Sequence, residues 1–266
     1  MSGYGSSSRR ESQFELTCLS VVMRFRWSGP GLLGNIARHE EARERERERD
    51  VRQMPLTWAN AGVEDFLPED DALIGARRNA AEVGGAAPVS PLTGGTLRFV
   101  AAAIGARSVV EIGTGCGTSG IWLLRGMRPG AVLTTVDSEP EHQRLARAAY
   151  LAAGFPASRY RLIGGLALEV LPRLADGAYD IVFCDADRLE LNEYLASALR
   201  LLRPGGIVLF NAVLPGSTGN ERQPTAAEAA AAAELREQVR ADERLTPLLL
   251  PIGNGLLAAA KQAGSG

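Results

Sequence analysis

The segment of residues 109–124, VVEIGTGCGTSGIWLL, constrains the fold of this chain more than any other. Two β-branched residues lead to an acid, Glu111, and then to three alternating glycines, Gly113, Gly115 and Gly117, which precede an apolar run. β-Branched residues favour a buried strand, the glycines allow a tight loop, and the apolar run favours a helix. We therefore expect a strand–loop–helix unit whose loop lets a ligand approach the backbone closely.

The rest of the chain alternates between strand-like and helix-like runs. We expect strands at residues 108–112, 131–137, 160–163, 179–187 and 207–213, with helices between them and a final hairpin that turns at residues 253–255. Ser90 before Pro91, Ser138 in S-E-P-E and Thr225 in T-A-A-E are predicted helix caps. The helix before the fifth strand is expected to end at the P-G-G of residues 204–206. This order predicts a doubly wound, Rossmann-like α/β fold, a seven-stranded sheet with an antiparallel terminal strand.

Residues 1–53 differ in composition from the rest of the chain. They begin rich in Ser, Gly and Arg and close with RHEEARERERERDVRQ, a highly charged run. Because such a segment has little apolar surface to bury, we expect residues 1–53 to be a low-complexity, disordered extension and residues 54–266 to form the folded domain. Met54 follows the charged run directly, and we interpret it as an alternative translation start.

Composition disfavours several classes of function. A net charge of −2 and a pI near 5.9 give no electrostatic basis for binding nucleic acid or an anionic membrane. The sequence has no run of 18 apolar residues, so we expect no transmembrane helix. The three cysteines have no metal-ligand spacing, and we expect them to be reduced thiols of a cytoplasmic protein.

Acidic residues mark the ends of three predicted strands: Glu111 on the first, Asp137 on the second, and Asp185 with Asp187 on the fourth. In a doubly wound sheet these carboxyl ends line one crevice, which is therefore acidic and favours an ammonium or a sulfonium over a phosphate. The run GCGTSG at residues 115–120 also fits G-x-G-x-x-G, and Asp137 lies at about the right distance to bind a ribose. An NAD-dependent oxidoreductase is therefore an alternative.

Five motifs, in their order and spacing, resemble those of class I S-adenosylmethionine-dependent methyltransferases. Among these, the chain is most similar to the O-methyltransferases that include catechol and caffeoyl-CoA methyltransferases and many bacterial relatives. The motifs are VVEIGTGCGTSGIWLL, LTTVDSEPEHQRLARAAYLAAG, YDIVFCDADRLELNEYL, LRLLRPGGIVLFNAVLPG and DERLTPLLLPIGNGLLAAAK. The resemblance covers residues 68–262, and it implies S-adenosyl-L-methionine as the cofactor and the class I methyltransferase fold.

The resemblance also implies which residues hold this cofactor. Glu111 and Ser119 would bind its methionine end, and Asp137 would accept both ribose hydroxyls. Ser138 and Ala167 would lie beside the adenine, and Val89 would close the pocket. The full set that the resemblance implies is Val89, Glu111, Gly113, Thr114, Gly115, Gly117, Ser119, Asp137, Ser138, Ala167, Asp185 and Asp187.

The chain departs from the metal-dependent members of the family at their metal site and at their catalytic base. In those members a strand-four aspartate and an Asp-Asn pair bind a divalent cation, and a lysine acts as base. Here Asp185 is present, but the pair is Asn211-Ala212 and Arg188 replaces the lysine. One carboxylate and one amide are a poor site for a hard cation, and arginine cannot be deprotonated in a protein. We therefore expect no metal, Asp185 as the catalytic group, and Asp185, Arg188 and Asn211 around the acceptor. We expect His142 at the surface.

These observations predict an S-adenosylmethionine-dependent O-methyltransferase that acts on a small, partly apolar, hydroxylated acceptor without an obligatory metal. Its expected location is the cytoplasm, and because relatives commonly form homodimers, a homodimer is expected. A protein that binds S-adenosylmethionine without catalysis is the first alternative, and an NAD-dependent oxidoreductase is the second.

Overall fold

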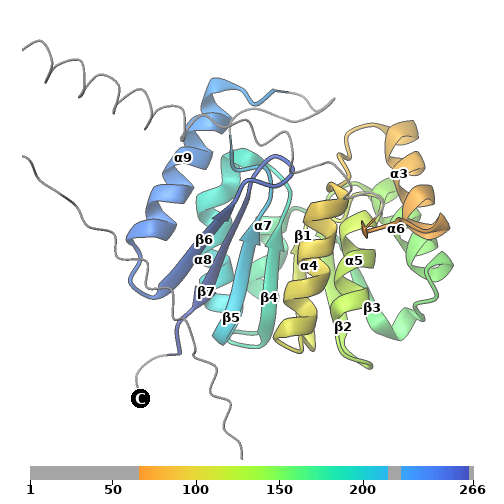
Figure 1. Cartoon of the computed structure of the whole chain (residues 1–266), viewed down its shortest axis with the longest axis horizontal. Helices are drawn as coiled ribbons and strands as arrows, with labels where there is room; N and C mark the ends of the chain where they lie inside the picture. The colour runs from red at the N-terminus through yellow and green to blue at the C-terminus, as the bar shows by residue number, and fades with distance from the viewer. Residues whose placement is uncertain (1–65, 215–222, 264–266) are drawn as a thin grey trace, which may run out of the picture. The chain divides into compact units, whose positions relative to one another are not determined.

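The computed structural model describes residues 66–214 and 223–263 of the chain, and the predictions for residues 1–53 and Met54 lie outside the described residues. In the described part, seven strands form one sheet in the order β3-β2-β1-β4-β5-β7-β6 (Figure 1). The strands are β1 (Ser108–Ile112), β2 (Val132–Asp137), β3 (Tyr160–Gly164), β4 (Tyr179–Cys184), β5 (Leu202–Phe210), β6 (Leu245–Leu250) and β7 (Leu256–Lys261).

The first five strands are parallel, and β7 is antiparallel to both β5 and β6. The connection between β6 and β7 passes through Gly253 and Gly255, with φ of 53° and 87°. These values lie in the left-handed region that glycine adopts without a steric penalty, which is why the predicted hairpin turns there. The predicted α/β fold with a doubly wound sheet and an antiparallel terminal strand is confirmed.

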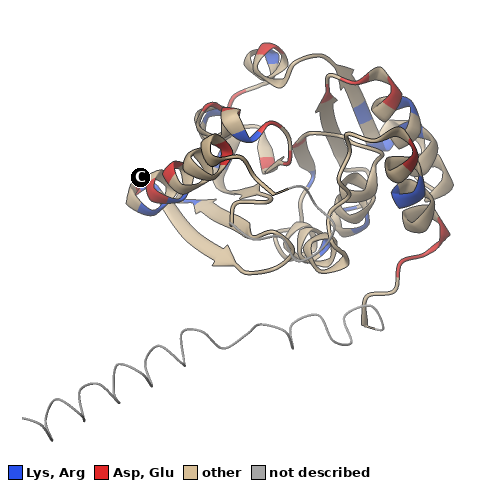
Figure 2. Ribbon diagram, turned by 90° about the horizontal axis from the view of Figure 1, so that it is seen from above, with Lys and Arg blue, Asp and Glu red and all other residues tan. Residues whose placement is uncertain are grey.

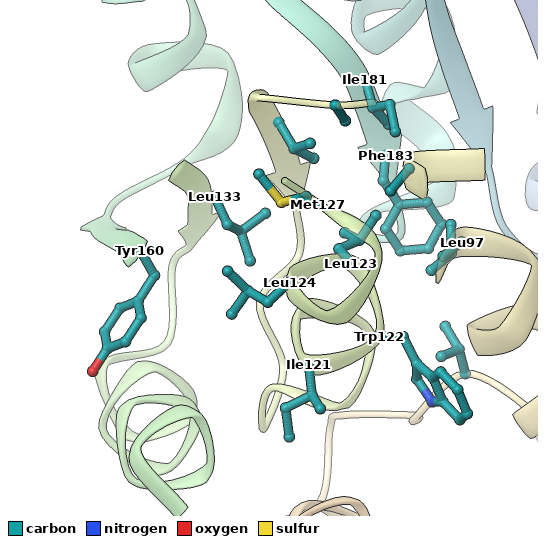
Figure 3. Close-up of a cluster of buried hydrophobic side chains, with 14 of the residues drawn as sticks. Leu97, Ile121, Trp122, Leu123, Leu124, Met127, Leu133, Tyr160, Ile181 and Phe183 are labelled. Atoms are coloured by element: carbon teal, nitrogen blue, oxygen red, sulfur yellow. The ribbon is translucent and has the colours of Figure 1, made fainter. Parts of the chain in front are cut away.

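Helices cover both faces of this sheet. The helices are α3 (Asp71–Val83), α4 (Pro91–Ala103), α5 (Thr118–Gly126), α6 (Pro140–Ala152), α7 (Ala167–Val170), α8 (Leu191–Leu201) and α9 (Ala226–Ala241). One core cluster joins the sheet to α3, α4, α5 and α6, and the other joins it to α8 and α9. Val109 of β1 belongs to the first cluster and Val110 to the second, as expected for a strand buried on both faces. Figure 3 shows part of the first cluster, including Trp122 and Phe183.

Two predicted helix caps are confirmed. The hydroxyl of Ser90 accepts a hydrogen bond of 3.1 Å from the amide of Thr93 at the start of α4. At α9, Thr225 and Glu228 form a reciprocal capping box, with hydrogen bonds of 3.2 and 2.7 Å. Each cap satisfies amides that the first turn of a helix leaves without a partner.

Two local predictions are wrong. Ser138 does not cap α6: the cap residue is Glu139, without a side-chain hydrogen bond, because the fixed φ of Pro140 occupies the first helical position. The amide of Glu139 donates instead to the carboxylate of Asp137 at 2.9 Å. At the fifth strand, β5 begins at Leu202, before the P-G-G run, and the register of its pairing with β4 shifts between Tyr179 and Ile181.

Candidate active site

A cavity of about 1280 Å³ lies beyond the carboxyl ends of β1, β2 and β4. Its walls come from the segment after α3, the glycine loop after β1, the start of α6, the turn before α7, and the residues after β4. This is where a doubly wound sheet places its ligand. Of the predicted residues, the lining includes Val89, Gly113, Thr114, Gly115, Ser119, Asp137, Ser138, Ala167, Asp185, Asp187 and Arg188. Glu111, Gly117 and Asn211 do not line it.

Glu111 lies beneath the glycine loop and is fully buried. The hydroxyls of Ser119 and Thr135 donate to its two carboxylate oxygens at 2.6 and 2.7 Å. Burial raises the pKa of Glu111 from 4.5 to about 8, with smaller contributions from the charges of Asp185 and Asp137, against the two hydrogen bonds, which lower it. Glu111 therefore supports the loop through Ser119 and does not face the cavity.

The three glycines of the loop have different structural roles. A β-carbon on Gly113 would stand 2.1 Å from the carbonyl oxygen of Asp185, and one on Gly117 would stand 3.0 Å from the Tyr150 ring. Gly115 has more room, since Ala86 at 3.6 Å is the nearest group. Gly113 and Gly117 are thus required by protein packing, and Gly115 is the glycine whose backbone is open to a ligand.

The start of α5 suits a carboxylate. Thr118, the first residue of α5, lines the cavity and is 4 % exposed, yet its buried hydroxyl has no hydrogen-bond partner within the described part of the chain. The preceding cap position is Gly117, which provides no side chain to satisfy the first amides of the helix. A helix start with unpaired donors binds anions, so the amino-acid carboxylate of S-adenosylmethionine fits here. The sequence pattern did not single out Thr118.

Asp137 ends β2 at the other side of the loop. Its carboxylate accepts hydrogen bonds of 2.9 Å from the amides of Gly115 and Glu139. A carboxylate has about four acceptor positions, so two remain for the hydroxyls of a ribose. His142, whose side chain is 12 % exposed, lies with Nδ1 3.5 Å from Oδ1 of Asp137. The expectation of a surface position for His142 is wrong, because α6 begins at Pro140 and directs its first turn toward the cavity.

Three acidic residues, Asp185, Asp187 and Glu190, lie in the part of the cavity wall that follows β4. Figure 2 shows acidic residues in red and basic residues in blue along the ribbon. The carboxylate of Asp185 accepts a hydrogen bond of 3.1 Å from the side-chain amide of Asn211. Asn211 therefore lies behind Asp185 and outside the lining of the cavity. Tyr194 donates to Glu190 at 2.6 Å, and both residues line the cavity. The sequence pattern placed Tyr194 on the apolar face of its helix. The spacing of four residues between Glu190 and Tyr194, which can bring two side chains together on a helix, was the signal for the hydrogen bond between them.

The donors at the family's metal position do not fit a divalent cation. Asp185 and Asn211 are hydrogen bonded to each other, and Ala212 offers no side-chain oxygen. Within residues 66–214 and 223–263, no group of three or more His, Cys, Asp or Glu side chains could hold a metal ion. Mg²⁺ keeps several of its waters and is usually bound through one or two carboxylates, and Asp185 is the one carboxylate at this position. No helix in the same ranges is long and apolar enough to cross a membrane.

Comparison with known proteins also identifies the O-methyltransferase class that the sequence motifs predict. The model of the O-methyltransferase family matches residues 73–262. A Mycobacterium tuberculosis protein named "Probable O-methyltransferase" is 47 % identical over 204 residues, which are 77 % of this chain and 90 % of that protein. The chain belongs to the O-methyltransferase family. Its activity is that of an S-adenosylmethionine-dependent O-methyltransferase.

Two solved structures support the same conclusion. The O-methyltransferase from Bacillus cereus in complex with SAH is 30 % identical, with a TM-score of 0.68 and coverage of 79 % of this chain and 100 % of that one. The O-methyltransferase TomG from Streptomyces achromogenes in complex with SAM is 29 % identical, with a TM-score of 0.69 and the same coverage. The similarity therefore extends over the whole of both relatives.

Proposed function

We propose that this O-methyltransferase methylates a hydroxyl of a small, partly apolar acceptor without an obligatory metal, and that Asp185 receives the hydroxyl proton. The hydrogen bond from Asn211 to Asp185 carries this proposal. It fixes the orientation of a carboxylate on the cavity wall and engages the two side chains that a metal would otherwise need.

The cofactor would lie along the glycine loop. Thr118 and the first amides of α5 would bind its carboxylate, and the two remaining acceptor positions of Asp137 would bind the ribose hydroxyls. Ala167 and Ser138 line the same end of the cavity and would flank the adenine. Glu111 and Gly117 would act through the shape of the loop, since neither lines the cavity.

The acceptor would occupy the cavity beyond β4. Leu189, 57 % exposed, offers an apolar surface there, while Arg188, Asp187 and Glu190 offer polar contacts. This mixture suits a compact acceptor with an apolar body and a hydroxyl. The acceptor oxygen would lie next to Asp185, whose orientation depends on Asn211.

The reaction is a methyl transfer in line with the breaking bond. S-Adenosylmethionine, when bound, supplies an electrophilic methyl group on a sulfonium. The residues that hold the cofactor would present this methyl group to the acceptor oxygen, and the electron pair of the sulfur–carbon bond would remain with the cofactor's sulfur. Asp185 takes up the hydroxyl proton, a role that Arg188 cannot perform. Alignment of the two reactants in the cavity supplies much of the rate, on the order of 7–11 kcal/mol in favourable cases.

A methyl-transfer screen tests this function. Purified protein with S-adenosylmethionine and a panel of phenols, catechols and hydroxylated acids should give a methylated product by mass spectrometry, at equal rates with EDTA or magnesium. Asp185→Asn should lower kcat, whereas Glu193→Asn, an exposed acid of α8, should not. A strict need for magnesium would contradict the metal-free mechanism. Binding of S-adenosylmethionine without methyl transfer would favour a binding protein. Binding of NAD and not of S-adenosylmethionine would favour an oxidoreductase.

We further propose that the enzyme is a cytoplasmic homodimer. Cys116 and Cys184 are free thiols, which persist in a reducing compartment. Phe99 of α4 is 72 % exposed, and aromatic side chains are enriched in interfaces between protein chains. Light scattering of the purified chain should give the mass of a dimer, and Phe99→Asp should shift it toward the monomer. A monomeric wild type would overturn the dimer.

A further inference from the structure

We propose that His142 is a positioning residue for cofactor binding, whose imidazolium holds Asp137 and the segment of residues 84–89 in place on either side of the ribose site. The proposal rests on the function proposed above, because it assigns a role within the same cofactor site. It concerns a residue that the sequence pattern placed at the surface.

His142 stands between two groups that can only accept hydrogen bonds. Its Nδ1 is 3.5 Å from Oδ1 of Asp137, and its Nε2 is 3.4 Å from the carbonyl oxygen of Gly84. A neutral imidazole has one N–H, whereas the charged ring has two. Only the charged ring can present an N–H to both neighbours. We therefore assign the contact to the charged ring as part of the proposal.

Acidic groups surround Asp137, so a positive charge beside it is electrostatically favourable. The charge of Asp137 contributes, after burial, to raising the pKa of both Glu111 and Cys116. On α6, Glu139 lines the cavity, and the pKa of Glu141 is lowered mainly by its hydrogen bond with Arg144 and to a lesser extent by His142. Among the described residues, His142 is the only basic side chain in contact with Asp137.

The contact leaves Asp137 able to bind a ribose. At 3.5 Å the His142–Asp137 separation exceeds the usual 2.7–3.2 Å of an N–H···O hydrogen bond, so the ring acts as a nearby charge and a support. The two acceptor positions that the amides of Gly115 and Glu139 leave unused are still available. His142 thus contacts Asp137 without occupying the acceptor positions that a ribose would use.

The second contact of His142 holds a wall of the cavity. Gly84 and Gly85 have φ of 70° and 72°, and the chain then continues along the cavity to Val89, which is 3 % exposed. Residues 84–89 contain no charged side chain, so the contact of Gly84 with His142 is the polar link between this segment and α6. Loss of that link should loosen the segment next to the ribose site.

Calorimetric titration with S-adenosylhomocysteine between pH 6.0 and 8.5 tests the proposal. Because the proposal assigns the contact to the charged ring, the wild-type affinity should fall as the pH rises. At pH 6.0, His142→Gln should weaken binding about tenfold, a typical effect of losing one charged contact, and the two proteins should converge at pH 8.5. His142→Lys keeps the charge and should keep the tight affinity at both pH values.

Glu111, with a pKa raised to about 8, and the ligand's own amine also titrate in this range. The decisive quantity is therefore the ratio of affinities between each variant and the wild type at one pH. Arg147→Gln, an exposed change on α6 away from the cavity, is the matched control and should behave like the wild type. Equal affinities of wild type and His142→Gln at pH 6.0 would overturn the proposal.

A second measurement needs no ligand. Hydrogen exchange at pH 6.0 should be faster for residues 85–89 in His142→Gln than in the wild type, and unchanged in Arg147→Gln. If the wild type ignored S-adenosylhomocysteine, the proposed cofactor site would fail, while this exchange result would still decide the role of His142. Unchanged exchange in His142→Gln would refute that role even if the cofactor bound.

Discussion

Glu111→Gln should raise the free energy of unfolding by an amount that grows with pH. Burial raises the pKa of Glu111 from 4.5 to about 8, so the folded protein holds a proton that the unfolded chain releases. Stability from this group is complete below pH 4.5 and is lost as the pH rises through 8. Because one pKa unit corresponds to about 1.4 kcal/mol, the wild type loses about 4 kcal/mol between pH 5 and pH 9. Glutamine does not ionise and loses none of it.

The surrounding hydroxyls can accept the amide. Thr135 lies 2.7 Å from both Glu111 and Thr114, and Ser119 donates to the other carboxylate oxygen. The amide oxygen of glutamine can accept from Ser119, and its NH₂ can donate to Thr135, which then donates to Thr114. The substitution therefore leaves no buried group without a partner, and its cost at pH 5 should be small.

Urea unfolding at several pH values between 5 and 9 measures this effect. The difference between Glu111→Gln and the wild type should increase by about 4 kcal/mol over the range, most steeply between about pH 5.5 and pH 7, and should level off above about pH 8. Glu193→Gln on the exposed face of α8 is the matched control, and its difference should stay constant. A constant difference for Glu111→Gln would show that Glu111 is ionised in the folded protein throughout, and the reasoning would be wrong.

Three further changes have outcomes that depend on single contacts. Asp137→Ala should weaken S-adenosylhomocysteine binding by about 1–3 kcal/mol in calorimetry, since two hydroxyls lose their acceptor, and unchanged affinity would remove Asp137 from the site. Gly113→Ala should lower the free energy of unfolding by about 2–4 kcal/mol, because φ is 93° and the carbonyl oxygen of Asp185 stands 2.1 Å from the position of the alanine β-carbon. A variant as stable as the wild type would contradict this packing. Asp180 accepts from Arg203 and from the amides of Arg107 and Ser108, and these bonds lower its pKa from 3.8 against the opposing effect of burial. Asp180→Asn should therefore reduce stability at neutral pH and lose its disadvantage as the pH falls below 3.8, which thermal unfolding against pH would show.

The sequence predicted the parts of the fold that local chemistry controls. The strand of residues 108–112 was placed correctly because β-branched residues precede glycines, and Ser90 and Thr225 cap helices because their hydroxyls reach amides three residues on. The cap at Ser138 failed because two signals competed for one helix start, and the proline determined it. A pattern of capping residues does not reveal which of two adjacent starts is used.

The candidate site was predicted less completely, since a residue's distance from the ligand depends on packing. Sequence identified Glu111 and Gly117 as ligand contacts, yet both lie behind the loop surface. It missed Thr118 and His142, because their roles depend on where α5 and α6 begin. The predicted acidic crevice is present, with Asp137, Asp185 and Asp187 in its lining.

The contact between Asp185 and Asn211 explains how one change can alter both metal binding and acid–base chemistry. Two carboxylates at 3.1 Å would repel each other, and a cation or a shared proton would be needed to keep them together. An amide at the same position donates a hydrogen bond to Asp185 and needs neither. Asparagine thus replaces a carboxylate ligand with a neutral amide and, by the same geometry, orients the carboxylate that remains. The proposed mechanism uses this arrangement, because it requires Asp185 to accept a proton without a cation to orient it.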